Sequence, residues 1–173
     1  LPGKHKGQDV SIQDVFEAVG AHAAGKITDA ELKDLENAAC PGPGACGGQF
    51  TANTMANTLS VLGLSPMGVN DVPAVDPKKK DAAYSVGEAV MKAHTKGIRS
   101  SHLLTRESLE NAAAVVAATG GSTNAVLHLL AIAAEAEVVF TLEDIDRINR
   151  LTPTLADLKP GGRFMAPDMY KAG

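Results

Sequence analysis

The sequence predicts a predominantly α-helical chain with at most a few short strands. Helix-start signals recur along it. Ser11, Thr28, Thr105 and Thr141 each stand three residues before an acidic residue or a serine, and each precedes apolar residues at helical spacing. Glycine or proline follows most of these stretches, as is typical of helix ends. Only from Pro153 onward does the helical pattern loosen.

The first forty residues predict a loop followed by two helices. Residues 1–10 are rich in glycine and lysine and predict a loop. A first helix begins after Ser11 and is closed by Gly25, and a second begins at the capping box of Thr28 and ends at Pro41. The apolar stripes are Ile12, Val15, Phe16 and Val19 in the first helix, and Leu32, Leu35 and Ala39 in the second.

The middle of the chain predicts two further helices separated by an irregular connector. One runs from just after Cys46 to near Gly63, and residues 65–68 form a turn. Residues 70–77 contain two prolines and predict no regular element. A helix near residues 78–96, ended by Gly97, carries the stripe Ala82, Val86, Val90 and Met91.

The last third of the chain predicts a helix pair and then a looser tail. A helix is expected near residues 106–118, built on Leu109, Ala112, Ala113 and Val116. The helix after residue 124 is apolar nearly all round, so we expect it to lie at the centre of the domain, with His128 as a core histidine. A short helix follows Thr141. Residues 155–158 and 163–165 predict short strands or extended loops.

Composition and charge limit the class of protein. A chain of 173 residues, 45% hydrophobic and 21% charged, can form one domain with a sizeable core. Only 3% of the residues are aromatic, so the core must consist largely of aliphatic side chains. The formal net charge of −4 argues against a nucleic-acid binder, because no basic face is available for phosphates.

The sequence favours a cytoplasmic protein. Its apolar runs are too short to cross a membrane, and residues 1–7 have no signal-peptide pattern. The two cysteines, Cys40 and Cys46, form neither a disulfide framework nor a CxxC pair. A reducing compartment suits them.

Both cysteines lie in the most unusual stretch, residues 39–55, which reads ACPGPGACGGQFTANTM. Its glycines and prolines predict a tight loop that presents Cys46 and then continues into a buried helix. Backbone N–H groups and the positive end of a helix stabilise a thiolate, so the pattern favours a metal ligand. The alternative is an inert, buried cysteine in a turn.

Two other glycine-rich patterns are typical of loops that bind ligands. Residues 42–47 match the GxGxxG expression of dinucleotide sites, but such a site follows a strand, whereas a helix is predicted here. Residues 120–124, Gly-Gly-Ser-Thr-Asn, precede a helix and suit an anion through free N–H groups. They suit equally an ordinary turn between helices with Ser122 as the N-cap.

Taken together, four stretches resemble the dihydroxy-acid dehydratase family, which includes phosphogluconate and sugar-acid dehydratases. They are residues 1–4 (LPGK), residues 39–55, residues 120–124 with Leu127, His128 and Leu129, and residues 171–173 (KAG). The similarity extends over essentially the whole chain.

The resemblance implies an α/β N-terminal domain followed by a β-barrel domain. It also implies an iron–sulfur cluster, [2Fe–2S] or [4Fe–4S], held by three cysteines of which Cys46 matches the third. Cys40 matches a position that is common in the family but is not a cluster ligand. The other two cysteines, the ligands of a Mg²⁺ ion and a catalytic serine have no counterpart. We therefore expect residues 1–173 to be an interior slice of the N-terminal domain, without the β-barrel, of a longer parent enzyme.

The resemblance further implies a hydro-lyase. A cluster iron with an open position accepts the 3-hydroxyl of a 2,3-dihydroxy acid, Mg²⁺ holds the carboxylate and 2-hydroxyl, and a base removes the C2 proton to give a 2-keto acid. Cys46 is the one residue assigned to this machinery. No catalytic residue is assigned. A substrate-facing role for Ser122 or Thr123 is a hypothesis that rests on their position at a helix start. The slice alone should be inactive, and the parent enzyme should form a homodimer or larger homo-oligomer.

The sequence contains opposing indications of the substrate within the family. Residues 51–55 and 62–65 favour the enzyme of valine, isoleucine and leucine biosynthesis, whereas residues 73–76 are closer to sugar-acid members. Gln49 and Phe50 replace the Met-Tyr or Met-Phe of many members, a change expected to be minor. A metal-free helical binding or scaffold domain is the alternative from another class.

Overall fold

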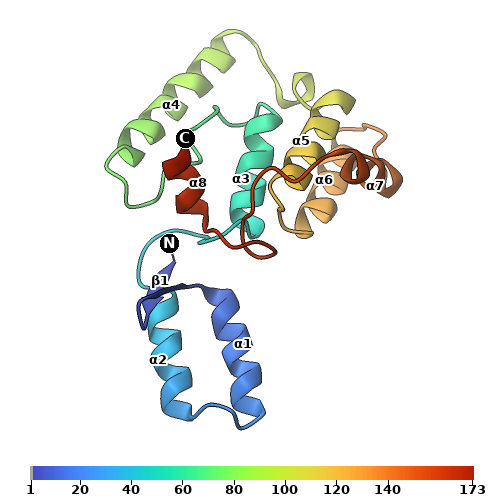
Figure 1. The fold of residues 1–173 in the computed structure, drawn as a ribbon. Coiled ribbons are helices and arrows are strands. Elements are labelled where there is room, and N and C mark those ends of the chain that lie inside the picture. Colours follow the sequence, from blue (N-terminus) through green and yellow to red (C-terminus); the bar gives the residue numbers. More distant parts are fainter. Residues whose placement is uncertain (1) are drawn as a thin grey trace.

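A computed structural model describes residues 2–173, so the predictions for Leu1 lie outside the described residues. The chain is mainly helical, as predicted, with one small sheet (Figure 1). Along the chain lie strands β1 (Gly3–His5) and β2 (Gln8–Val10), helices α1 (Ile12–Ala23), α2 (Asp29–Ala39), α3 (Thr51–Val61) and α4 (Lys79–Thr95), a 3₁₀ turn (Ser100–His102), and helices α5 (Arg106–Ala118), α6 (Asn124–Glu135), α7 (Leu142–Leu151) and α8 (Ala166–Ala172).

The N-terminal segment is a β-hairpin, so the prediction of a loop over residues 1–10 was wrong for its described part. β1 and β2 pair antiparallel, with Gly3 opposite Val10. Lys6 and Gly7 join them with φ values of 50° and 84°. A two-residue turn with both φ angles positive matches the twist of a hairpin, and glycine favours it.

Helices α1 and α2 begin at the predicted capping boxes. The Asp14 carboxylate accepts hydrogen bonds from the backbone N–H and the hydroxyl of Ser11, at 2.7 and 3.0 Å. Glu31 makes the same two contacts with Thr28, both at 2.9 Å. These bonds satisfy backbone donors that the first helical turn leaves unpaired. The two helices form a hairpin that stands away from the rest of the molecule (Figure 1).

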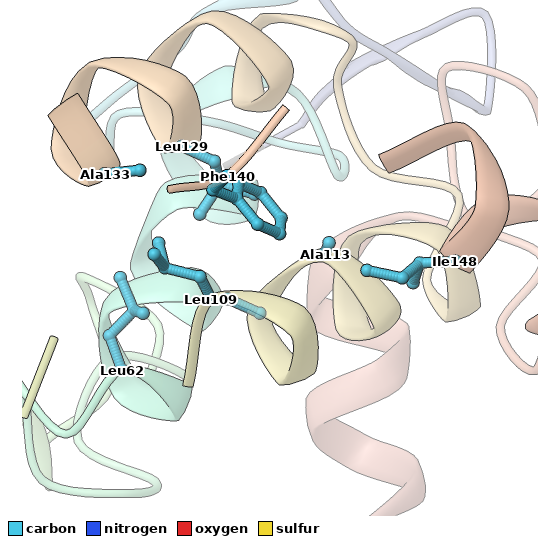
Figure 2. Close-up of a cluster of buried hydrophobic side chains, with 8 residues drawn as sticks. Leu62, Leu109, Ala113, Leu129, Ala133, Phe140 and Ile148 are labelled. Atoms are coloured by element: carbon cyan, nitrogen blue, oxygen red, sulfur yellow. The ribbon is translucent and has the colours of Figure 1, made fainter. Parts of the chain in front are cut away.

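The hydrophobic core lies among α3, α5, α6 and α7 (Figure 2). Leu109 and Ala112 of α5 are fully buried, and Leu129 of α6 is 1% exposed. Phe140, just before α7, fills the space between these helices. The cluster consists of Leu62, Leu109, Ala112, Ala113, Leu129, Ala133, Phe140 and Ile148.

Helix α6 is buried on one face only, so the prediction that it lies at the centre was wrong in part. Ala125, Leu129 and Ala133 face the core, but Leu127 is 66% exposed. His128 is exposed too, so its interpretation as a core histidine was wrong. A helix with apolar residues all round can be buried on any face. The neighbouring helices decide which face is buried.

The stripes predicted for α1 and α4 are likewise largely exposed. Phe16 of α1 is 69% exposed and Val90 of α4 is 60% exposed. None of the residues of α4, all within the described part of the chain, is buried.

The C-terminal tail differs from its prediction. Residues 155–158 and 163–165 form no regular strand, and a single bridge joins Leu158 to Phe164. Helix α8 was not predicted. Its first turn contains Pro167, and the Asp168 carboxylate accepts a hydrogen bond from the N–H of Met165 at 3.0 Å. Both are helix-start features that the sequence carried.

Within residues 2–173, no helix has the length and apolar character needed to cross a membrane.

Candidate functional site

The cysteine loop (residues 40–50) connects α2 to α3 and is held from the C-terminal tail. The N–H of Gln49 donates to the carbonyl oxygen of Lys159 at 2.7 Å, and the N–H of Ala166 donates to that of Gly47 at 2.9 Å. Gly48 is buried, and a Cβ there would lie 3.0 Å from the Lys159 oxygen. Close packing against residues 159–166 therefore requires glycine at position 48.

Cys46 lies in the bend just before α3, as predicted. Its side chain is half-buried, whereas Cys40 is exposed. The thiol donates to the carbonyl oxygen of Gly48 at 3.1 Å, so the described sulfur contact is a carbonyl and not the expected N–H groups. Asn53 of α3 donates to the carbonyl oxygens of Gly48 and Cys46, at 2.7 and 3.3 Å. The amide of Asn53 thus fixes the backbone on both sides of Gly47.

The helix α2 precedes the glycines of this loop, where a dinucleotide site would have a strand. The structure therefore agrees with setting aside the GxGxxG match of residues 42–47.

The glycine turn (residues 120–124) lies directly against the start of α3. The N–H of Ser122 donates to the hydroxyl oxygen of Thr54 at 2.9 Å. The hydroxyls of Thr51 and Ser122 are 3.2 Å apart, and the Asn124 amide donates to Thr51 at 2.9 Å. Two motifs about seventy residues apart in sequence are thus joined by hydrogen bonds.

Gln49 links the cysteine loop to Thr119, the residue just before the glycine turn. Its side chain is 2% exposed, and its amide donates to the hydroxyl of Thr119 at 3.1 Å. Thr119 in turn donates to the carbonyl oxygen of Val115 at 2.8 Å. Sequence analysis gave Gln49 no role. The signal that could have found it is a lone amide at a site where apolar residues are common.

The N–H groups of the glycine turn are mostly engaged within the protein. Gly121 donates to Val116 at 2.9 Å, Ser122 donates to Thr54, and Asn124 donates to the Ser122 hydroxyl at 3.2 Å. These bonds favour the ordinary turn over the anion site. The N-cap of α6 is Thr123, however, one residue later than predicted.

A pocket of about 270 Å³ opens beside the turn. Its lining includes Gly121 and Thr123 of the turn and Ile145 and Asn149 of α7. Thr123 is exposed at the pocket, while the Ser122 hydroxyl is occupied by its contacts with Thr51 and Asn124.

The chain matches known proteins over its full length. A family model for "Dihydroxy-acid/6-phosphogluconate dehydratase N-terminal" matches residues 1–173. The chain belongs to this dehydratase family. The suspected resemblance is thereby confirmed.

Three similar relatives share one name. Proteins named "Dihydroxy-acid dehydratase" from Koribacter versatilis, Roseiflexus sp. and Thermus thermophilus are 58%, 55% and 54% identical to the chain, each over 172 residues. These matches cover 99% of the chain but only 30%, 31% and 31% of the respective relatives. The chain thus spans about a third of the length of the relatives it matches.

The described residues do not complete a metal site of the kind the dehydratase resemblance implies. Among residues 2–173, no three side chains of histidine, cysteine, aspartate or glutamate are grouped to share a metal ion. Cys46 is one thiol, and Cys40 points to solvent six residues away. A cluster held by three thiolates requires donors from outside the described residues.

Proposed function

We propose that the chain is part of a hydro-lyase that removes water from 2,3-dihydroxy carboxylic acids to give 2-keto acids. The observation that carries this proposal is the match to proteins named "Dihydroxy-acid dehydratase" at 51–58% identity across nearly the whole chain. The resemblance of residues 51–55 and 62–65 to the branched-chain enzyme supports, as the substrate, a precursor in valine, isoleucine and leucine biosynthesis. The parent enzyme then acts in the cytoplasm as a homo-oligomer.

In this proposal Cys46 is one of three thiolate ligands of an iron–sulfur cluster, and Mg²⁺ is bound elsewhere in the parent enzyme. The geometry supports a positioning role for the loop around it. Asn53 fixes the carbonyls of Cys46 and Gly48, and the tail holds Gln49 and Gly47. A ligand held by a pre-ordered backbone loses little conformational entropy when metal binds.

The test is Cys46→Ser in the parent enzyme, with Cys40→Ser as the matched control. Iron per chain and visible absorption are measured on both purified variants. We expect Cys46→Ser to lose most of its iron and its dehydratase activity, because a hydroxyl replaces a thiolate ligand. Cys40→Ser should keep both, since Cys40 is exposed. Full iron content in Cys46→Ser contradicts the ligand assignment, whereas a wild-type parent protein that contains no iron favours the metal-free scaffold alternative.

Substrate choice is tested separately on the wild-type parent enzyme. Values of kcat/KM are compared for 2,3-dihydroxy-3-methylbutanoate, gluconate and 6-phosphogluconate. We expect the branched acid to be preferred. A higher kcat/KM for a sugar acid would contradict the proposed substrate but agree with the hydro-lyase reaction.

A further inference from the structure

The hydroxyl of Thr54 links the cysteine loop to the glycine turn through one oxygen atom. It donates to the carbonyl oxygen of Gln49 at 3.0 Å and accepts from the N–H of Ser122 at 2.9 Å. Thr54 is 1% exposed, so water does not compete for either bond. A buried hydroxyl that donates once and accepts once fixes the relative positions of both partners.

Gly121 permits the close approach on which this contact depends. A Cβ at position 121 would lie 2.9 Å from Cγ2 and 3.1 Å from Oγ1 of Thr54. It would also lie 3.2 Å from Cγ1 of Val116. The glycine of the turn therefore serves packing against α3, in addition to the turn itself.

A second buried bond runs parallel to the first. The Gln49 amide donates at 3.1 Å to Thr119, the residue just before the glycine turn, and the Gln49 carbonyl oxygen accepts from Thr54. Gln49 and Thr119 are 2% and 7% exposed.

We propose that Thr54 is a positioning residue that joins the cysteine loop and the glycine turn into one unit, so that the two segments open and close together. The coupling follows from the buried hydrogen bonds of Thr54 and Gln49 and does not depend on the proposed function. That this unit carries an active site rests on the proposed function. In the parent enzyme the turn thereby sets the position of the backbone that carries Cys46.

The test is hydrogen exchange on the parent enzyme, measured by mass spectrometry on peptides that cover residues 46–50 and 119–124. The variant Thr54→Val keeps the shape of the side chain and removes both hydrogen bonds. We expect exchange to rise about tenfold or more in both peptides, since two buried polar groups lose their partner. Thr54→Ser keeps the hydroxyl and should restore near wild-type exchange.

Thr58→Val is the matched control. Thr58 lies one turn later in α3, is fully buried, and donates within the helix to the carbonyl oxygen of Thr54 at 2.8 Å. Loss of the Thr58 hydroxyl should leave hydrogen exchange in the two peptides close to that of the wild type. Should Thr54→Val not yield folded protein, Gly121→Ala tests the same contact from the other side, with the same expected rise in both peptides.

Four results would overturn the proposal. They are no rise in either peptide of Thr54→Val, a rise in one peptide only, an equal rise in Thr58→Val, or no rescue by Thr54→Ser. None of them bears on dehydratase activity, which is measured on the wild-type enzyme. Failure of the coupling and failure of the proposed function are therefore separate outcomes.

Discussion

At the scale of single residues, Asp144 joins a helix start to a neighbouring helix. Its carboxylate accepts from the N–H of Thr141 at 2.9 Å and forms an ion pair with Arg106 of α5. The hydrogen bond from Arg106, followed by that from Thr141, holds the pKa of Asp144 below its ordinary value. Arg106 also lies over the ring of Phe140, 5.4 Å from its centre.

This contact predicts a pH-dependent contribution to stability. A carboxyl whose pKa is lower in the folded than in the unfolded state stabilises the fold above its unfolded pKa. The stabilisation is lost as pH falls through the folded pKa. We expect Asp144→Asn to lower the free energy of unfolding of the chain at neutral pH, and the difference from wild type to shrink below about pH 4.

Urea denaturation at a series of pH values measures this difference. Asp146→Asn is the control, because its pair with Arg150 is largely exposed and contributes little. A difference between wild type and Asp144→Asn that stays constant down to pH 2 would contradict the assignment.

At the scale of secondary-structure elements, capping boxes decide where helices begin. The hydroxyl of Thr28 accepts from the N–H of Glu31 at 3.3 Å, and Glu31 returns a bond to the N–H of Thr28. Both lie on the surface, so local hydrogen bonding alone fixes the start of α2. This is why the sequence predicted it.

Thr28→Ala should therefore destabilise the chain by about 1 kcal/mol, since the backbone N–H of Glu31 loses the hydroxyl that accepts its hydrogen bond. Urea denaturation measures the change. Thr95→Ala is the control, because Thr95 is exposed in the last turn of α4 and its hydroxyl donates back to the carbonyl oxygen of Met91 in the same helix. Equal free energies of unfolding for Thr28→Ala and Thr95→Ala would show that the cap does not stabilise the chain.

At the scale of the whole molecule, α5 holds the core together. Leu109 is fully buried in the cluster that α3, α6 and α7 share with α5. Leu109→Ala should lower the free energy of unfolding by about 2–5 kcal/mol, because it leaves a cavity among well-packed side chains. The measurement is again urea denaturation of the chain.

Leu155→Ala provides the comparison for this cavity. Leu155 is 80% exposed, so its loss should change the free energy of unfolding by no more than about 0.5 kcal/mol. A small effect of Leu109→Ala, equal to that of Leu155→Ala, would show that α5 is not central.

The sequence by itself determined the features that depend on neighbours along the chain. Helix starts at Ser11, Thr28 and Thr141, and the bend before α3, follow from local hydrogen bonds and backbone preferences. Family membership belongs here too, since it rests on residue identities. The hairpin of β1 and β2 and helix α8 also carried local signals, in Gly7 and Pro167, that sequence analysis did not use.

Only the tertiary structure decided which faces are covered and which motifs meet. The stripes of α1 and α4 are as apolar as those of buried helices, yet Phe16 and Val90 are exposed, because burial depends on a neighbour that the stripe does not specify. The Thr54–Ser122 and Gln49–Thr119 bonds join residues about seventy positions apart, and no local pattern encodes such a pairing. Hydrogen bonds between distant segments depend on how the helices that carry them pack against one another.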